Sequence, residues 1–158
     1  MGRFMDLAAG DSREILTVIG LDDLAALDDR RRFPAHLALG GGLDPTWLDL
    51  FSEAIRQVTG SEGPSDFLDA RFELEVPPSE ASRCSVERVD AAWVGAVARV
   101  SDRDIDGIAG RWIDLVEEEL GDLAREEKPW IRELAGRLVS FCRAADREPD
   151  VLFAWSLG

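Results

Sequence analysis

Residues 68–76 read LDARFELEV, and their alternation is the strongest fold signal in the chain. Apolar side chains occupy every second position from Leu68 to Val76, and charged side chains stand between them. A period of two residues is typical of a β-strand with one buried and one solvated face. Pro77 and Pro78 end the predicted strand. Because strands of a parallel sheet are usually apolar on both faces, the pattern favours an antiparallel sheet.

The segments around this strand predict an α+β fold. We expect a single compact domain, with a mainly antiparallel or mixed sheet packed by about four to five helices. Residues 84–89 are the expected neighbouring strand, and residues 151–157, VLFAWSL, the closing strand. Apolar residues at helical spacing predict helices over residues 44–60, 91–99 and 101–121, and a further helix after Pro129.

The N-terminal part is more ambiguous. The short apolar runs over residues 3–8 and 14–19 are consistent with two strands, or with a strand followed by a short helix. We prefer two strands. Residues 21–27 are expected to be helical, and residues 33–39 could form a short helix with Pro34 in its first turn.

Composition excludes several classes of protein. A chain of 158 residues with 46% hydrophobic content fits one domain with its own core. A net charge of -14 disfavours nucleic acid and anionic membrane as partners and predicts a soluble protein. We see no secretory signal or membrane span, so a cytoplasmic location is expected. The single lysine beside many arginines is typical of a GC-rich bacterial genome.

His36 is the only histidine, and it lies in the segment LDDRRRFPAHLALGGG, residues 27–42. It is the one side chain whose ordinary pKa lies near neutral pH. Any catalytic role would therefore involve His36, with Arg30 and Asp29 as its candidate partners and Asp28, Arg31 and Arg32 beside them. The alternative is a packed, hydrogen-bonded histidine without a catalytic role. No known nucleophile motif accompanies it.

Other motifs fail when their spacing is tested. Asp102, Asp104 and Asp106 reproduce the first half of a calcium-binding EF-hand loop, but Ile113 stands where the closing glutamate belongs. They are at most a weak metal candidate, and we expect no metal and no cofactor. The glycines at residues 40–42 lack the spacing of a phosphate-binding loop.

The clearest surface feature is acidic. Glu117, Glu118, Glu119, Glu126 and Glu127 are expected to form either a solvated face or a surface for a basic protein partner. The five tryptophans mostly fall on predicted apolar stripes and are expected in the core. Cys142 lies on such a stripe, and Cys84 is also interpreted as structural.

The segment DRRRFPAHLALGG, residues 29–41, resembles the signature of the YfbM-like bacterial proteins. Asp29, Arg30, His36, Leu39 and Gly41 occupy the corresponding positions in register. Phe33 is one position from the place of the family's tryptophan, and Pro34 departs from the pattern. The resemblance implies a small α+β domain without a known cofactor or an established activity.

Two functions are left open. The favoured one is a nonenzymatic protein-binding module, of the immunity or regulatory type, that uses its acidic surface. The alternative is a small-molecule-binding protein or small enzyme with a pocket around His36. A concave pocket that holds His36 together with a convergent arginine would favour the second function, and a histidine enclosed by core side chains without a pocket would count against it.

Overall fold

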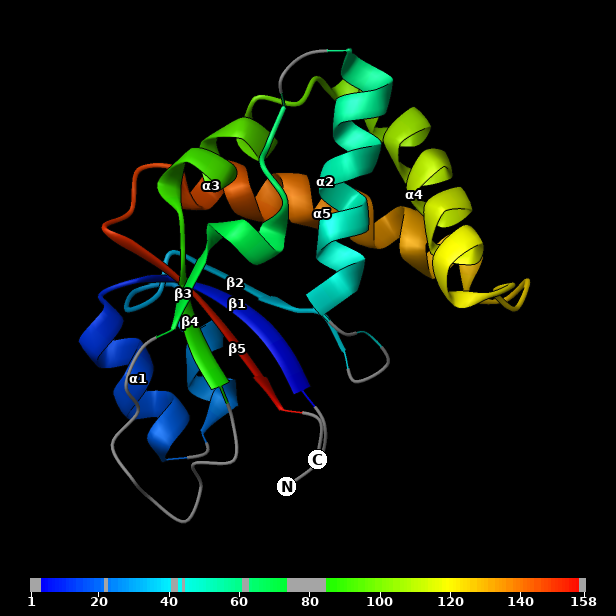
Figure 1. Cartoon of the computed structure of the whole chain (residues 1–158). Helices are drawn as coiled ribbons and strands as arrows, with labels where there is room; N and C mark the ends of the chain where they lie inside the picture. Colours follow the sequence, from blue (N-terminus) through cyan, green and yellow to red (C-terminus); the bar gives the residue numbers. More distant parts are fainter. Residues whose placement is uncertain are drawn as a thin grey trace. The chain divides into compact units, whose positions relative to one another are not determined.

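The computed structural model describes residues 4–21, 23–40, 43, 45–60, 63–73 and 85–156 (Figure 1). These residues form five α-helices and a five-stranded sheet with the strand order β2-β1-β5-β4-β3, in which every neighbouring pair is antiparallel. The predicted α+β class with an antiparallel sheet is therefore confirmed. No helix in these ranges is both long and apolar enough to span a membrane.

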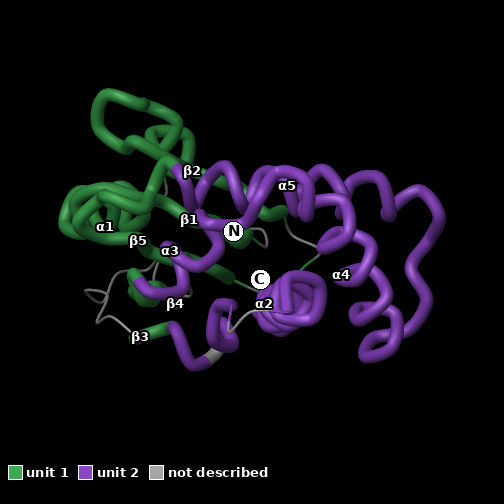
Figure 2. Tube along the Cα trace, turned by 90° about the horizontal axis from the view of Figure 1, so that it is seen from above, with its two compact units in different colours: residues 1–43, 71–91, 144–158 green, residues 44–70, 92–143 purple. Residues whose placement is uncertain are grey.

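The chain divides into two compact units, which Figure 2 draws in green and purple. Unit 1 comprises Met1–Leu43, Arg71–Ala91 and Ala144–Gly158, and it contains the sheet. Unit 2 comprises Asp44–Ala70 and Ala92–Arg143, and it contains most of the helical residues. The single domain expected from the composition stays a prediction.

The sheet of unit 1 is built around two long, apolar strands. Its strands are β1 (Phe4–Gly10), β2 (Ala35–Ala38), β3 (Arg71–Glu73), β4 (Ser85–Val89) and β5 (Asp150–Ser156). The central pair, β1 and β5, is buried along almost its whole length, as expected for strands with neighbours on both sides. The strands predicted at residues 84–89 and 151–157 are confirmed over their described residues, which belong to β4 and β5.

The segment after β1 is a helix, so the strand predicted at residues 14–19 is wrong. Helix α1 spans Ser12–Gly20 and begins after Asp11, whose Oδ1 accepts a hydrogen bond of 2.8 Å from the backbone N–H of Arg13. Ile15, Val18 and Ile19 are buried on one face of the helix at spacings of three and four residues. The helix predicted next, at residues 21–27, is a 3-10 helix, η1 (Leu24–Asp28).

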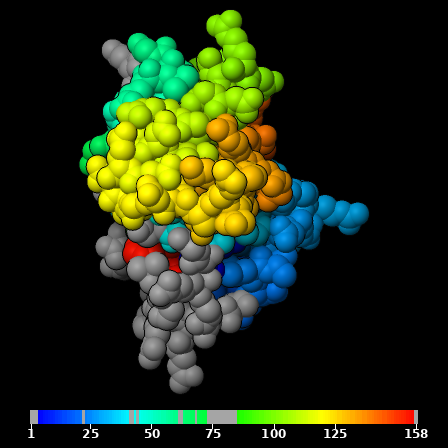
Figure 3. All heavy atoms as spheres, turned by 90° about the vertical axis from the view of Figure 1, so that its right-hand side faces the viewer, coloured from blue at the N-terminus to red at the C-terminus, as the bar shows by residue number. Residues whose placement is uncertain are grey.

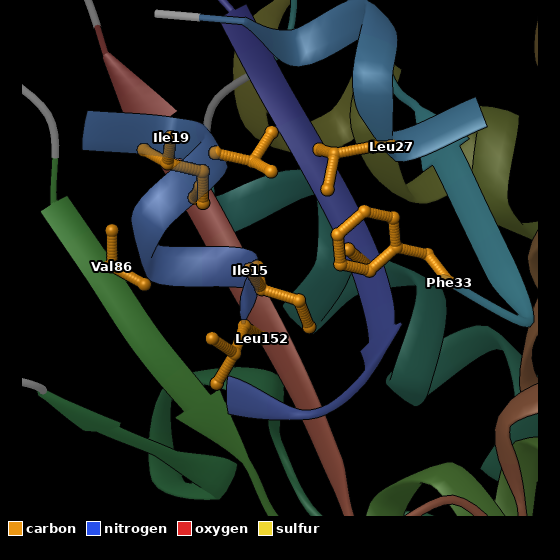
Figure 4. Packing of buried hydrophobic residues seen from close by; sticks show 9 residues of the cluster. Ile15, Ile19, Leu27, Phe33, Val86 and Leu152 are labelled. Atoms are coloured by element: carbon orange, nitrogen blue, oxygen red, sulfur yellow. The ribbon is translucent and has the colours of Figure 1, made fainter. Parts of the chain in front are cut away.

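Helix α1 and η1 pack on one face of the sheet (Figure 4). The face is apolar because alternate residues of β1, β4 and β5 project from the same side. The buried cluster consists of Ala8, Ile15, Val18, Ile19, Leu27, Phe33, Val86, Leu152 and Ala154.

The short helix predicted over residues 33–39 is also wrong, because residues 35–38 form the edge strand β2. The backbone N–H groups of Arg32 and Phe33 both bond to the carbonyl of Asp29, which closes a turn before the strand. β2 then pairs with β1, with Ala35 opposite Ala9 and Ala38 opposite Asp6. The hydrogen bonds that β1 supplies replace those that a helix would have made internally.

Unit 2 is a group of helices with an aromatic core. Its elements are α2 (Pro45–Thr59), η2 (Phe67–Ala70), most of α3 (Ala91–Ala98), η3 (Asp102–Asp104), α4 (Ile105–Leu120) and most of α5 (Lys128–Ala145). The Trp112 ring contacts Phe51 at 4.8 Å and Trp47 at 6.4 Å between ring centroids, and its Nε1 donates to the Trp47 carbonyl at 2.8 Å. The three long helices predicted from apolar spacing are confirmed.

Two aromatic residues depart from the predicted core. Only residues 71–73 of the predicted strand 68–76 are in β3, residues 67–70 form η2, and residues 74–76 lie outside the described residues. Phe72 is 54% exposed on this edge strand, while the side chain of its neighbour Arg71 is mostly buried. Trp130 is 40% exposed because it precedes, by one residue, the buried stripe of α5 that starts at Ile131. Cys142 is buried as predicted, and Cys84 lies outside the described residues.

Candidate functional site: a histidine between two carboxylates

His36 is positioned by the pairing of β2 with β1. It lies directly opposite Ala8, and Ala38 lies opposite Asp6. Because residues paired across an antiparallel ladder project to the same face, His36 and Asp6 share one face of the sheet. Asp28, the last residue of η1, approaches the same imidazole ring.

Both ring nitrogens of His36 are within hydrogen-bonding distance of a carboxylate. Nε2 lies 2.6 Å from Oδ2 of Asp6, and Nδ1 lies 2.7 Å from Oδ1 of Asp28. The His36 and Asp6 side chains are each only 7% exposed, whereas Asp28 is 68% exposed. The histidine therefore has one buried and one solvent-facing carboxylate partner.

These contacts shift the pKa values of His36 and Asp28. Burial by itself would lower the pKa of His36, but the hydrogen bonds and negative charges of Asp6 and Asp28 outweigh it and raise the pKa above its ordinary value of 6.5. The hydrogen bond from His36 lowers the pKa of Asp28, more strongly than burial raises it. The site therefore favours the imidazolium form of His36 and the ionised form of Asp28.

This arrangement limits what His36 can do chemically. A neutral imidazole acts as a general base through a nitrogen that carries no proton, and both nitrogens here face carboxylate oxygens. An imidazolium ion that donates to two carboxylates has no lone pair left to accept a substrate proton. The geometry therefore favours charge pairing and binding over proton abstraction by His36.

A pocket of about 320 Å³ lies beside the histidine. Asp6, Asp28 and His36 form its polar part. The rest of the described lining is apolar or small and comprises Phe4, Met5, Leu24, Ala25, Ala38 and Gly40. The pocket meets one part of the expectation for a ligand-binding role, because it holds His36, but no arginine is among the described residues that line it.

The other predicted partners of His36 come directly after η1 in the chain. Arg30 donates from Nη1 to the Leu27 carbonyl at 3.0 Å, and its Nη2 lies 3.9 Å from Asp28. Asp29 accepts a hydrogen bond of 3.0 Å from the Arg31 backbone N–H within a turn. Neither Arg30 nor Asp29 is among the described residues that line the pocket.

Asp6 is the site residue that the sequence analysis missed. It lies 30 residues before His36, in the otherwise apolar run FMDLAAG, residues 4–10. A carboxylate in a strand that is buried along its length requires a partner, because an unpaired buried charge is costly. That single acidic residue was the signal that could have identified it.

The predicted acidic residues lie at the end of α4 and in the segment that follows, in yellow in Figure 3. Two of them have local partners. Glu117 lies 3.4 Å from the Nζ of Lys128 and accepts from the Leu123 backbone N–H at 3.1 Å, and Glu118 lies 3.5 Å from Arg111. Glu119, Glu126 and Glu127 are exposed.

The weak metal candidate is not assembled as a metal site. Asp102 and Asp104 are in η3, Asp106 is in the first turn of α4, and the Asp102 carboxylate lies 2.6 Å from Nη1 of Arg143. Within the described part of the chain, no group of three or more His, Cys, Asp and Glu side chains could hold a metal ion. Gly41 and Gly42 lie outside the described residues.

No family model, no curated protein and no solved structure matches this chain. The resemblance to the YfbM-like proteins therefore stays a prediction.

Proposed function

We propose that this protein is a nonenzymatic binding protein of the bacterial cytoplasm, and that its His36 pocket holds a small organic cation with an apolar body. The observation that carries the proposal is the pair of carboxylates, from Asp6 and Asp28, on the two sides of one imidazolium ion at the wall of a pocket.

The charge of the pocket supports a cationic ligand. The two carboxylates and the imidazolium ion that line the pocket sum to a net charge of about -1, and the guanidinium of Arg30, which does not line it, lies 3.9 Å from Asp28. Asp28 is 68% exposed, so its second carboxylate oxygen can accept a hydrogen bond from an ammonium group. The net charge of -14 on the whole chain also favours the approach of cations over anions.

The walls of the pocket set the size and the polarity of the ligand. Phe4, Met5 and Leu24 provide apolar contacts for the body of the ligand. The volume of about 320 Å³ is near the small end of the range for ligand pockets. We therefore expect a primary amine with a single ring or a short branched chain.

The only histidine of the chain provides a direct assay. With ¹⁵N-labelled histidine, the protein gives one pair of ring-nitrogen NMR signals, both from His36. We expect benzylamine to shift these signals saturably, and the neutral benzyl alcohol and the anionic benzoate to shift them much less. Equal shifts with benzoate, or no saturable shift with benzylamine at millimolar concentration, would contradict the proposal.

A pair of matched variants tests the role of Asp28. Asp28→Asn removes the solvent-facing charge and should weaken benzylamine binding about tenfold, the loss expected for one charge-assisted hydrogen bond. Asp23→Asn is the control, because Asp23 is exposed, makes no capping hydrogen bond and does not line the pocket. If both variants bind benzylamine as the wild type does, Asp28 does not contact the cation.

The acidic surface supports a second candidate function, binding of a basic protein. Glu119, Glu126 and Glu127 are exposed, and the Glu118 side chain is 62% exposed despite its contact with Arg111. Affinity purification from the native host at low salt should then recover a basic partner. A variant with these four residues changed to glutamine should lose that partner. Recovery of no reproducible partner by the wild-type protein would contradict this function.

A further inference from the structure

A second and larger pocket lies within unit 2, about 530 Å³ in volume. Ile55 of α2 and Ala96 of α3 contribute apolar surface to it, together with Val100. Arg99 and Asp104 also line it and bring opposite charges to the same space. Neither of these two side chains has an ion-pair partner among the residues that the structure describes.

We propose that this pocket binds a small zwitterion that carries a carboxylate and an ammonium group, of the dipeptide type. The Arg99 guanidinium would bind the carboxylate with two parallel hydrogen bonds, a geometry that arginine favours. The Asp104 carboxylate would bind the ammonium group. Ile55, Ala96 and Val100 would contact the apolar side chain of the ligand.

The wall that carries both charges is held in place by Arg143 of α5. Its Nη2 donates to the Val100 carbonyl at 2.5 Å, its Nε donates to the Ala98 carbonyl at 3.3 Å, and its Nη1 lies 2.6 Å from the Asp102 carboxylate. The contacted residues, Ala98, Val100 and Asp102, lie on both sides of Arg99 in the sequence. The connection between α3 and η3 is therefore ordered before any ligand arrives.

A second part of the pocket lining, at Gly63, is held by Arg56 of α2. Its guanidinium donates to the Pro64 carbonyl at 2.7 Å, to Asp66 at 2.7 Å and to Glu53. Gly63, which lines the pocket, has a φ of +54°, and a Cβ on it would lie 2.9 Å from Cγ of Arg56. Only glycine allows the chain to approach α2 so closely in this conformation.

Two arginines thus fix these two parts of the lining through backbone carbonyl groups, and neither uses its charge on the pocket itself. A pocket that is already formed does not lose binding free energy to the ordering of its walls. Among the described residues no side chain pairs with Arg99 or Asp104, so both charges can bind a ligand, and their opposite signs select a zwitterion over a simple anion or cation.

Three related probes test this selection by amide NMR of the full chain. Glycyl-L-leucine should shift the amide signals of residues 96–104 saturably. N-acetyl-glycyl-L-leucine, which lacks the ammonium group, and glycyl-L-leucinamide, which lacks the carboxylate, should each bind at least about tenfold more weakly. The His36 ring signals should not move with glycyl-L-leucine, which separates this site from the first pocket. No saturable shift with glycyl-L-leucine at millimolar concentration would overturn the proposal.

Variants assign the two charges separately. Arg99→Gln should remove the preference for glycyl-L-leucine over its amide, and Asp104→Asn should remove the preference over its N-acetyl form. Arg103→Gln and Asp106→Asn are matched controls, because both residues are exposed in the same segment and neither lines the pocket. Unchanged preferences in the Arg99 and Asp104 variants, with native amide spectra, would overturn the proposal.

Discussion

The Nε2 atom of His36 lies 2.6 Å from Oδ2 of Asp6, and each of these two side chains is only 7% exposed. The contact joins the edge strand β2 to β1 through side chains, in addition to the backbone ladder. A charged pair in such surroundings costs desolvation free energy, so the loss of either partner leaves a poorly solvated charge. This pair therefore dominates the pH dependence that we expect.

The first prediction concerns pH. The folded pKa of His36 is raised above 6.5, so the folded protein binds this proton more tightly than the unfolded chain does. The resulting stabilisation is fully present below the unfolded pKa and is lost as the pH rises through the folded pKa. We expect the ¹⁵N titration of His36 to show the raised pKa, and urea unfolding to show the free energy of unfolding falling over that pH window.

The His36→Gln variant is the control for this prediction. It should lack the loss of stability over the same pH window, because His36 is the only histidine in the chain. A measured pKa of His36 at or below 6.5 would contradict the pairing of its ring with Asp6 and Asp28.

The second prediction compares the two carboxylates. Asp6→Asn should lower the free energy of unfolding by about 3 kcal/mol, because it leaves the imidazolium ion with one partner in a buried site. Asp28→Asn should cost about 1 kcal/mol or less, because the Asp28 side chain is 68% exposed and water replaces it. Both variants should lower the pKa of His36. If the two variants lose the same free energy of unfolding in urea at neutral pH, the burial of Asp6 does not contribute to the stability of the pair.

The third prediction concerns a buried hydroxyl group in unit 2. The Ser52 Oγ accepts from Nε1 of Trp93 at 2.9 Å and donates to the Leu48 carbonyl at 3.1 Å. Ser52→Ala leaves the buried indole N–H without its acceptor and should cost about 1–3 kcal/mol of stability. Ser140→Ala, at an exposed position of α5, is the matched control and should leave the urea midpoint nearly unchanged.

The fourth prediction concerns the core of unit 1. Ile15 is fully buried between α1 and the sheet, as Figure 4 shows, so Ile15→Ala should cost about 2–5 kcal/mol. Leu21→Ala is the control, because Leu21 is 74% exposed and its truncation should change stability by less than about 0.5 kcal/mol. A similar shift of the thermal midpoint in both variants would contradict the packing of α1 on the sheet.

The long helices were predictable because their signal is repeated. α2, α4 and α5 have 15, 16 and 18 residues and each carries a buried stripe, so the helical spacing recurs several times in each of them. β4 and β5 were predictable for a related reason, since β-branched, aromatic and other apolar residues are concentrated between turn-forming residues.

Short elements were not predictable in the same way. The apolar residues of α1, Ile15, Leu16, Val18 and Ile19, are compatible with a strand as well as with a helix. The helix is stabilised by the N-terminal cap from Asp11 and by the packing of its apolar side chains against one face of the sheet. In β2, only four residues are in the strand, and their conformation depends on the hydrogen bonds that β1 supplies.

Local pattern and composition were enough to establish the α+β class, the acidity of the chain, the buried position of Cys142 and the uniqueness of His36. The partner of His36 was decided only by the tertiary structure. Asp6 reaches the imidazole because the backbone register of β2 against β1 places Ala8 opposite His36. That register depends on hydrogen bonds between segments 30 residues apart, and no local periodicity of either segment encodes it.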